Sequence, residues 1–423
     1  MIVNKAYKIE LKPNNKQRTA MASSAGCARF AYNWGLAQRI ELYEKEKKST
    51  TAINQHKDLC AIKEEQFPWM YDVSKCAPQE ALRDLDKAFK NFFRGIKSGK
   101  KIGFPRFKSK HRSKSSFRIS TGAIYVNKST IKLPMIPGKL RLKEKGYIPT
   151  EGVKYNSFTV SKEVDKWFLS VQCVVELPEP GPRTGGVVGV DLGIKTLATV
   201  SDGMVYDNPK SYKKLERTMN RVQRERCRRV KGSANRKKSV QRLQKINYKI
   251  RNKRKDSLHK MTSDLVRTKP NLIVLEDLSV NNMLKNHKLA GALSDASFGE
   301  IRRQIEYKAA WYGSKVTFAG KFFPSSRLCS SCGVLKEDLT LSDRVYKCEC
   351  GSIIDRDLNA ALNLKRYGEF HRSLSKQKAC GEERLQFSAF YGAENGALLK
   401  SRNSTTSLPD EVDLYRFERT DKP

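Results

Sequence analysis

The sequence has no long apolar run, only five histidines and far fewer acids than bases. No stretch approaches the ~18 consecutive apolar residues of a membrane-spanning helix, so we expect no membrane partner. The histidines are scattered, without the close pair that a metal-dependent nicking transposase would need. No Gly-x-x-x-x-Gly-Lys-Ser/Thr loop occurs, which argues against ATP-driven work. The first residues lack the apolar segment of a signal peptide, and we expect a protein of the reducing cytoplasm.

The scarcity of acids leaves a large positive charge. Lysine and arginine number 83 against 44 acids, a formal net charge of +39 over 423 residues. Such an excess favours a polyanionic partner, of which nucleic acid is the common one. A basic surface that contacts only solvent is the alternative. A chain of this length has room for about three domains.

Four of the ten cysteines are closely grouped. Cys329-x-x-Cys332 is followed by Cys348-x-Cys350, and two close pairs of thiolates can surround one tetrahedral zinc ion. A disulfide pair or four unbound thiols is the alternative. The other cysteines have no such grouping and are interpreted as packing residues: Cys27, Cys60, Cys76, Cys173, Cys227 and Cys380.

A lone acid on a predicted β-hairpin is the first candidate catalytic residue. The apolar run of residues 187–190 leads to Asp191, and Gly193 marks the turn to a second strand. A carboxylate at such a position is costly unless it binds a cation or a proton. We interpret Asp191 as the first ligand of a divalent-metal nuclease site.

Two further acids end apolar segments. Glu276 follows the predicted strand of residues 271–275, and Asp357 lies in the first turn of a helix that Asp355 can cap. Taken singly, each is an ordinary strand-end or helix-cap acid. The three together, in a strongly basic chain, suit a site for two Mg²⁺ ions about 4 Å apart that hydrolyses a phosphodiester.

The N-terminal part alternates between strand and helix patterns. A strand at residues 3–11 precedes three predicted helices, at residues 16–47, 51–66 and 78–97. Strand-like pieces between residues 117 and 177 can close with the first strand into a small β-barrel. The helices would then be an insert in that barrel.

Two segments concentrate the positive charge. Residues 94–118 carry ten Lys/Arg and no acid, interleaved with phenylalanines, which suits phosphate contacts and base stacking. The proline-rich residues 177–182 then predict a stiff linker and a domain boundary. Residues 210–269 carry 23 Lys/Arg against four acids in a largely helical pattern. We favour a nucleic-acid cradle there over a solvated helix pair.

Several motifs, taken together, resemble those of the TnpB proteins of bacterial insertion sequences. They are residues 103–108, 189–193, 275–278, 322–326 and 355–361, together with the cysteine pairs. The likeness extends from residue 1 to about residue 366. TnpB proteins are RNA-guided DNA endonucleases related to the miniature type V CRISPR effectors.

The resemblance implies an α+β multidomain fold. An RNase H-like (RuvC) α/β nuclease domain with an inserted zinc ribbon would be preceded by a β-barrel wedge domain that carries a helical recognition insert. The expected ranges are 1–13 and 98–180 for the wedge domain, 14–97 for the recognition insert, 181–322 and 352–367 for the nuclease domain, and 323–351 for the zinc ribbon. Residues 368–423 are expected to form a disordered tail.

The resemblance also implies roles for single residues. Asp191, Glu276 and Asp357 would hold two catalytic Mg²⁺ ions, and the four grouped cysteines would hold one structural Zn²⁺. Lys75 and Gln79 match a pair that reads the short DNA motif beside the target. Candidates for contacts with the nucleic-acid backbone are Lys100, Lys101, Arg106, Lys108, Arg226, Arg228, Arg229, Lys237, Lys238, Arg251, Lys253 and Arg254.

The expected partners are a guide RNA and a double-stranded DNA target with its adjacent motif. We expect a monomer in the bacterial cytoplasm or nucleoid. Two other functions stay open: a catalytically inactive RNA-guided DNA-binding regulator, and a protein-only DNA-binding factor of a transposon.

Overall fold

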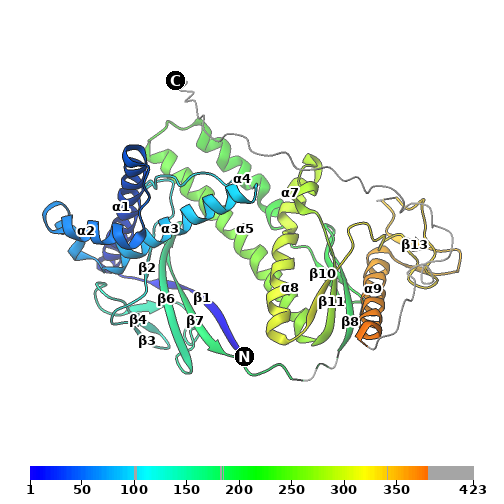
Figure 1. Cartoon of the computed structure of the whole chain (residues 1–423). Coiled ribbons are helices and arrows are strands. Elements are labelled where there is room, and N and C mark those ends of the chain that lie inside the picture. Colours follow the sequence, from blue (N-terminus) through cyan, green and yellow to red (C-terminus); the bar gives the residue numbers. More distant parts are fainter. Residues whose placement is uncertain (100–101, 182, 184, 341, 380–423) are drawn as a thin grey trace. The chain divides into compact units, whose positions relative to one another are not determined.

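The computed structural model describes residues 1–99, 102–181, 183, 185–340 and 342–379 (Figure 1). Contacts divide the chain into two compact units. Unit 1 comprises residues 1–183, 209–263 and 310–313, and unit 2 comprises residues 184–208, 264–309 and 314–423. Within the described ranges, each helix is too short or too polar to serve as a membrane span.

Unit 1 is built on a seven-stranded antiparallel sheet. Its strands are β1 (Ile2–Lys12), β2 (Ser116–Ile119), β3 (Tyr125–Val126), β4 (Thr130–Lys132), β5 (Leu140–Leu142), β6 (Val153–Glu163) and β7 (Lys166–Glu176), in the order β2-β6-β7-β1-β5-β4-β3. The alternating pattern of β1 sends Ile9 and Leu11 into the core, as period-two side-chain packing requires. Strands β2 and β3 are the edges of this sheet among the described residues, and its closure into a barrel stays a prediction.

Four helical segments separate β1 from β2. They are α1 (Asn15–Glu46), α2 (Ala52–Gln66), the 3₁₀ helix η1 (Pro68–Asp72) and α3 (Cys76–Lys97). A capping box starts α1, because the Asn14 side chain accepts from the Gln17 backbone N–H at 2.9 Å while Gln17 Oε1 accepts from the Asn14 backbone N–H at 3.0 Å. Helices α1 and α3 pack on each other through side chains that include Leu36, Leu82 and Leu85, all fully buried. These helices thus lie between the first and second strands of the sheet in sequence, and their assignment as a recognition insert stays a prediction.

The basic helices α4 (Ser211–Arg228) and α5 (Ala234–Arg267) fall mostly in unit 1, up to residue 263. From the sequence, both helices are expected in the nuclease domain, within residues 181–322. In the structure, residues of that range fall into both units. Contacts of α5 with the β6–β7 hairpin explain the difference. The Tyr248 ring lies 6.2 Å from the Phe168 ring, and Lys245 pairs with Asp165 at 2.9 Å.

Glu163, at the end of β6, is the centre of that contact. Its carboxylate pairs with Lys8 of β1, with Lys114 at 3.4 Å and with Arg251 of α5. Burial opposes ionisation of Glu163, but the hydrogen bond from Lys8 and the charges of Lys8 and Arg251 outweigh it and lower its pKa to about 2. Four parts of unit 1 are thus held by one acid.

We expect Glu163→Gln to lower the free energy of unfolding by about 2 kcal/mol at pH 7, allowing for solvent screening of the partly exposed cations. A carboxyl whose pKa is lowered on folding stabilises the protein above its unfolded pKa, and this contribution is lost as pH falls through the folded value. The difference between variant and wild type should therefore shrink below about pH 4.5 and vanish near pH 2. Denaturant titrations across this range measure it.

Asp165→Asn is the matched control, because Asp165 also pairs with α5 but lies in a largely exposed ion pair. Its effect should stay within ~0.5 kcal/mol. Equal effects of the two substitutions would contradict the central role of Glu163.

Unit 2 is built on a five-stranded mixed sheet. Its strands are β8 (Gly185–Asp191), β9 (Thr196–Val200), β10 (Val205–Asp207), β11 (Pro270–Glu276) and β12 (Lys315–Ala319), in the order β10-β9-β8-β11-β12. Strand β9 is antiparallel to both of its neighbours, β10 and β8, whereas β8, β11 and β12 run parallel to one another. The remaining elements are α6 (Val280–Met283), α7 (His287–Ala296), α8 (Phe298–Tyr312), the hairpin β13 (Val345–Lys347) and β14 (Ile353–Asp355), and α9 (Arg356–Ala379).

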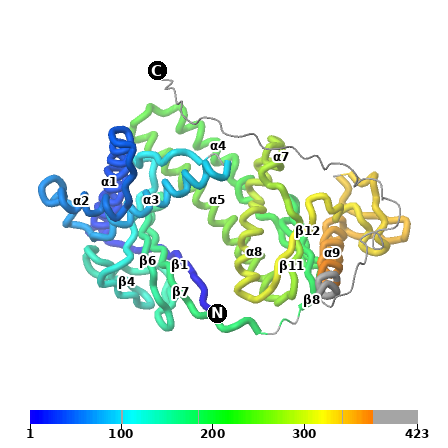
Figure 2. Tube along the Cα trace, in the orientation of Figure 1, coloured from blue at the N-terminus to red at the C-terminus, as the bar shows by residue number. Residues whose placement is uncertain are grey.

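Helix α9 packs directly on the sheet, and Figure 2 shows it alongside β8. The approach depends on glycine: a Cβ at Gly189 would lie 2.0 Å from the Ala361 carbonyl oxygen, and one at Gly368 would lie 2.4 Å from a methyl carbon of Val274. The helix continues to Ala379, past residue 367 where the sequence predicts the start of a disordered tail. Gly368 packs on the sheet there, which explains why the helix continues. The rest of that predicted tail, residues 380–423, lies outside the described residues.

Candidate functional site

The three predicted acids lie in unit 2. They come from three elements that meet at the carboxyl ends of the parallel strands β8 and β11. Strands β8 and β11 run parallel with Val190 opposite Leu275, so Asp191 and Glu276 are neighbours at the carboxyl ends of adjacent strands. Asp357 lies in the first turn of α9, which packs on β8 and β11. As the sequence predicts, Asp355 caps this helix, accepting from the Asp357 backbone N–H at 2.9 Å.

The electrostatics of this edge disfavour ionised acids in the absence of a cation. Burial raises the pKa of Asp191 well above its usual value, and the charges of Glu276 and Asp357 raise it further, with only Arg356 opposing. Burial also raises the pKa of Glu276, against a hydrogen bond from Ser325. Oxygen donors that repel one another in this way suit a hard divalent cation, which neutralises them together.

Two hydroxyl groups contact these acids. Thr196, the first residue of β9, donates from Oγ1 to the Asp357 carboxylate at 3.0 Å. Ser325, in the loop after β12, donates from Oγ to the Glu276 carboxylate. Neither residue was predicted from the sequence as part of the site. Ser325 had one signal, since it lies in the 322–326 motif, and Thr196 had none beyond its place after the hairpin turn.

The four grouped cysteines also converge. In the described part of the chain, they are the one set of three or more His, Cys, Asp or Glu whose ligand atoms all lie within 4.8 Å of one another. Cys329 Sγ lies 3.7 Å from Cys350 Sγ, and Cys332 Sγ lies 3.6 Å from Cys348 Sγ. A tetrahedral site with Zn–S bonds of about 2.3 Å has S–S edges of about 3.8 Å, so the four sulfurs fit one zinc ion.

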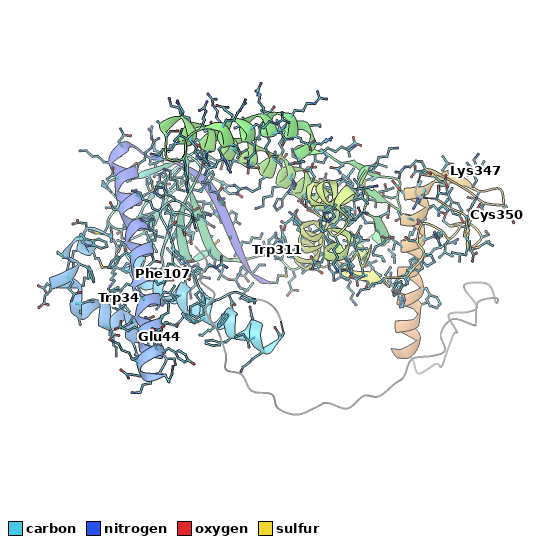
Figure 3. All side chains as sticks on the ribbon, turned by 90° about the horizontal axis from the view of Figure 1, so that it is seen from above. Trp34, Glu44, Phe107, Trp311, Lys347 and Cys350 are labelled. Atoms are coloured by element: carbon cyan, nitrogen blue, oxygen red, sulfur yellow. The ribbon has the colours of Figure 1, made fainter. Side chains whose placement is uncertain are left out.

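Each cysteine pair sits in a tight turn closed by a glycine. Gly333 and Gly351 have φ of 81° and 87°, a region that favours glycine. The Gly333 N–H donates to the Cys329 carbonyl at 2.9 Å, and the Gly351 N–H to the Cys348 carbonyl at 3.0 Å. Figure 3 shows Lys347 and Cys350 together next to α9. The tighter Cys348-x-Cys350 spacing is thus compatible with the same kind of turn.

The sulfurs perturb one another's protonation. Burial opposes ionisation of Cys329, but backbone N–H groups of Cys332 and Ser331 lower its pKa to about 6. For Cys348, a backbone hydrogen bond from Cys350 favours the thiolate, but burial and the neighbouring sulfurs outweigh it and raise the pKa to about 12. Four thiolates therefore coexist at this site only beside a cation.

The carboxylates of Asp191, Glu276 and Asp357 are spaced more widely than the four sulfurs. The sulfurs all lie within 4.8 Å of one another, whereas the carboxylate oxygens of the three acids do not. They still lie close enough for Glu276 and Asp357 to perturb Asp191. A pair of ions about 4 Å apart needs ligands over a wider area than a single ion does.

The predicted contacts with the nucleic-acid backbone divide into two groups. Some are already bound within the protein: Lys108 lies 3.6 Å from the Tyr32 ring centroid, Arg229 pairs with Glu225, and Arg251 pairs with Glu163. Others have exposed side chains in the loop before β2 or on α4 and α5: Arg106, Arg228, Lys237, Lys238 and Lys253. Arg226 and Arg254 are half-buried, and Lys100 and Lys101 lie outside the described residues.

Lys75 and Gln79 lie at the start of α3. Lys75 precedes the first helical residue and is exposed, whereas Gln79 is half-buried one turn later. Residues three and four apart share one face of a helix, so both can reach a single ligand. The neighbours Cys76 and Pro78 are buried.

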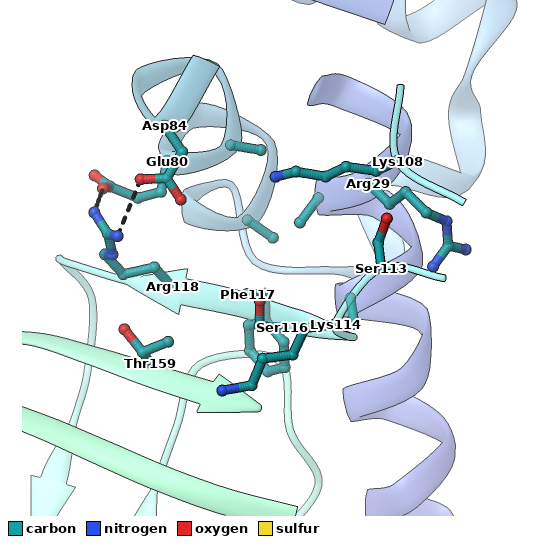
Figure 4. A pocket seen from close by; sticks show the side chains of 14 residues that line it. Arg29, Glu80, Asp84, Lys108, Ser113, Lys114, Ser116, Phe117, Arg118 and Thr159 are labelled. Carbon is teal, nitrogen blue, oxygen red and sulfur yellow. Dashed lines mark hydrogen bonds and ion pairs between the residues drawn. The ribbon is translucent and has the colours of Figure 1, made fainter. Parts of the chain in front are cut away.

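A polar cavity of about 120 Å³ lies between α1, α3 and β2. Figure 4 shows Arg118 of β2 pointing at Glu80 and Asp84 of α3, with which it pairs at 3.3 and 3.0 Å. Glu80 also accepts from Arg83 at 2.6 Å and from Ser120 at 3.0 Å. The two acids of this cavity are thus paired within the protein, and their pairs with Arg118 connect α3 to β2.

The fold and these two sites define a class: a mixed α/β protein with an acid cluster at the carboxyl ends of two parallel strands and a separate loop whose four cysteines could hold a zinc ion. Family models match three parts of the chain: "Probable transposase" at residues 170–287, "Cas12f1-like, TNB domain" at 298–364 and "Helix-turn-helix domain" at 1–48. The last range forms strand β1 and the single helix α1 in this structure.

Relatives cover nearly the whole chain. "Putative RNA-guided DNA endonuclease" of Streptomyces pristinaespiralis is 35% identical over 86% of this chain and 90% of that protein. "Putative RNA-guided DNA endonuclease InsQ" of Escherichia coli K12 is 33% identical over 89% of this chain and 94% of that protein. The chain belongs to the TnpB family, as its motifs predict.

One solved structure supports the fold. The "Cryo-EM structure of the Cas12f1-sgRNA-target DNA complex" superposes with a TM-score of 0.53 at 15% identity, covering 86% of this chain and 99% of that one. The similarity confirms the predicted mixed α/β multidomain architecture at the level of the fold.

Proposed function

We propose that this protein is an RNA-guided DNA endonuclease that hydrolyses target DNA at the acid cluster of unit 2. One observation carries the proposal: Asp191, Glu276 and Asp357, far apart in the sequence, come from three elements that meet at one sheet edge, where burial and mutual repulsion raise the pKa of Asp191. The relatives are named as RNA-guided DNA endonucleases, and a cluster of acids that can bind divalent cations suits the hydrolysis of DNA.

The strand order supports an RNase H-like (RuvC) assignment for unit 2. Three antiparallel strands, β10-β9-β8, continue into the parallel strands β11 and β12, and the acids lie at the ends of β8 and β11 and at the start of α9. The loop between β12 and α9 holds the cysteines and would be the zinc ribbon, residues 323–351. The sheet of unit 1 and its helices 14–97 would be the wedge domain and the recognition insert.

The donor sets fit the two expected metals. Asp191, Glu276 and Asp357 offer the oxygen ligands that Mg²⁺ prefers, and the cysteines offer a tetrahedral sulfur set for Zn²⁺. Bound Mg²⁺ would supply an activated water and stabilise the leaving 3′ oxygen of the cleaved strand. The Thr196 hydroxyl orients the Asp357 carboxylate, and the neighbouring registers of β8 and β11 keep Asp191 beside Glu276.

The nucleic-acid partners would bind the basic surfaces. The exposed cations of α4 and α5 suit the phosphates of a guide RNA or of its heteroduplex with DNA. Lys75 and Gln79 would read the short duplex motif beside the target. These residues lie in unit 1, whereas the proposed catalytic acids lie in unit 2.

We expect the combined reversal Lys237→Glu, Lys238→Glu and Lys253→Glu to weaken RNA binding at least about tenfold at 0.1 M salt and to reduce the slope of log affinity against log salt by about 2 to 3. Filter binding at several salt concentrations measures both. A matched control is Lys45→Glu with Lys48→Glu, on and just after α1, whose ammonium groups already pair with Glu41 and Glu46. An equal loss of RNA affinity in both variants would indicate a general effect of net charge. It would contradict a specific RNA-binding surface on α5.

Two assays separate this function from the alternatives. A denaturing gel of nucleic acid that co-purifies with the protein should show a discrete RNA, and its absence would favour a protein-only DNA-binding factor. With that RNA identified, a plasmid carrying the complementary target should be cut in Mg²⁺. Specific binding of the target without cleavage would favour the catalytically inactive regulator.

A further inference from the structure

The hydrogen bond between Ser325 and Glu276 links the acid cluster to the cysteine loop. Ser325 is buried, with 4% of its surface exposed, and its hydroxyl donates to the Glu276 carboxylate. It lies four residues before Cys329, in the segment that leads from β12 to the first cysteine turn. Among the described residues, this hydroxyl is the one hydrogen-bond donor to the Glu276 carboxylate.

Two asparagines of α9 hold this segment in place. Asn363 Nδ2 donates to the Ser325 carbonyl at 2.8 Å and to the Leu328 carbonyl at 2.7 Å. Asn359 Nδ2 donates to the same Leu328 carbonyl at 2.6 Å, and its Oδ1 accepts from the Ser330 backbone N–H at 2.9 Å. Both asparagines are almost fully buried: Asn359 is 0% exposed and Asn363 is 3% exposed.

These contacts tie two of the three acids to one rigid element. Helix α9 carries Asp357 in its first turn and, two and six residues later, the buried Asn359 and Asn363. Through Asn363 and Ser325, the same helix also determines where the Glu276 carboxylate lies. Hydrogen bonds of buried amides are costly to disrupt, so these contacts hold the segment of residues 325–330 firmly on α9.

We propose that Ser325 is a positioning residue that holds Glu276 in its metal-binding orientation, and that Asn363 holds Ser325. The inference rests on the proposed function, since it takes the acid cluster as the Mg²⁺ site. The cysteine loop then has a role besides local folding, because the turn that holds Cys329 continues the segment that orients Glu276. Hydrogen-bond partners of metal ligands typically contribute 10–100-fold to metal affinity or activity.

The physical reason lies in the surroundings of Glu276. Its carboxylate is half-buried next to Asp191 of the adjacent strand, so without the Ser325 hydroxyl it loses its hydrogen-bond donor. A rotamer that points towards solvent then becomes favourable. A cation must reverse that rotation to bind, and its affinity falls accordingly.

The experiment compares Ser325→Ala and Ser325→Thr with the full chain purified with its own RNA. Ser326→Ala is the matched control, as the adjacent serine has no side-chain hydrogen bond to the acid cluster among those described. The readouts are the Mg²⁺ concentration for half-maximal cleavage, Mn²⁺ binding followed by electron paramagnetic resonance, zinc content, and target binding in EDTA.

We expect Ser325→Ala to raise both the half-saturating Mg²⁺ concentration and the Mn²⁺ dissociation constant about tenfold. Zinc content and target binding should match wild type, and Ser325→Thr, which keeps the hydroxyl, should recover most of the metal affinity. Asn363→Ala should shift the same two quantities, and combining it with Ser325→Ala should add little, because both act on one contact.

Unchanged Mn²⁺ and Mg²⁺ dependence in Ser325→Ala would overturn the inference, as would an equal shift in Ser326→Ala. If wild type binds Mn²⁺ at the acids but cuts no DNA, the proposed nuclease function fails while the Mn²⁺ titrations still decide the role of Ser325. Absence of Mn²⁺ binding to wild type would overturn both.

Discussion

Asp191→Ala should abolish DNA cleavage while leaving the RNA complex and target binding intact. Asp191 ends β8 beside Glu276, and its carboxylate interacts with those of both other acids. Loss of a ligand from the proposed two-metal site should lower the cleavage rate on the order of 10³-fold or more. Single-turnover cleavage of a guide-matched plasmid in Mg²⁺ measures the rate, and a gel-shift assay in EDTA measures target binding.

The matched control is Asp202→Asn, which changes an acid in the turn after β9 whose carboxylate accepts from the Met204 backbone N–H at 3.0 Å. It should cleave at the wild-type rate. Equal cleavage by wild type and Asp191→Ala would remove Asp191 from the site, whatever the motifs indicate.

The same position should show opposite effects on activity and stability. Burial and repulsion raise the pKa of Asp191 in the folded state, so its ionised form destabilises the fold at pH 7 without metal. Asp191→Asn should therefore stabilise the metal-free protein by about 1 kcal/mol although it is inactive. Adding Mg²⁺ should stabilise wild type more than this variant, as thermal unfolding will show.

Removal of zinc is the second change with a large expected effect. We expect about one Zn per chain after exhaustive dialysis, and loss of that zinc in Cys329→Ser, because three sulfurs bind it far more weakly than four. The thermal midpoint should fall on the order of 10 °C, since the loop between β12 and α9 has few apolar contacts besides Leu328 and Tyr346. Metal analysis and calorimetry provide the two measurements.

Cys227→Ser is the control for zinc, since Cys227 is an exposed free thiol on α4. It should keep both the zinc and the midpoint. A folded, metal-free wild-type protein would show that the close approach of the four sulfurs serves packing alone.

Local patterns predicted the elements of the site well because each one depends on nearby residues. The apolar runs before Asp191 and Glu276 form strands, and Asp355 caps α9 as its spacing to Asp357 predicts. The cysteine spacing likewise predicted a four-sulfur group. In each case, a few consecutive residues contain the whole physical cause.

Domain ranges were harder to predict because they depend on contacts between distant segments. Helices α4 and α5 follow the first strands of unit 2 in sequence, yet Glu163 and Phe168 draw α5 to the sheet of unit 1. The polar sequence after Arg366 gave no core pattern, yet Gly368 packs α9 against Val187 and Val274. Neither contact has a signal in the local sequence.

By itself, the sequence determined the charge, the order of the elements and the grouping of the four cysteines, because composition and short spacing encode these, and its motifs indicated the family. The tertiary structure decided which acids are neighbours, which cations are already neutralised within the protein, and that Ser325, Asn359 and Asn363 connect the cysteine loop to Glu276. Those facts depend on strand register and helix packing, which bring together side chains separated by dozens of residues.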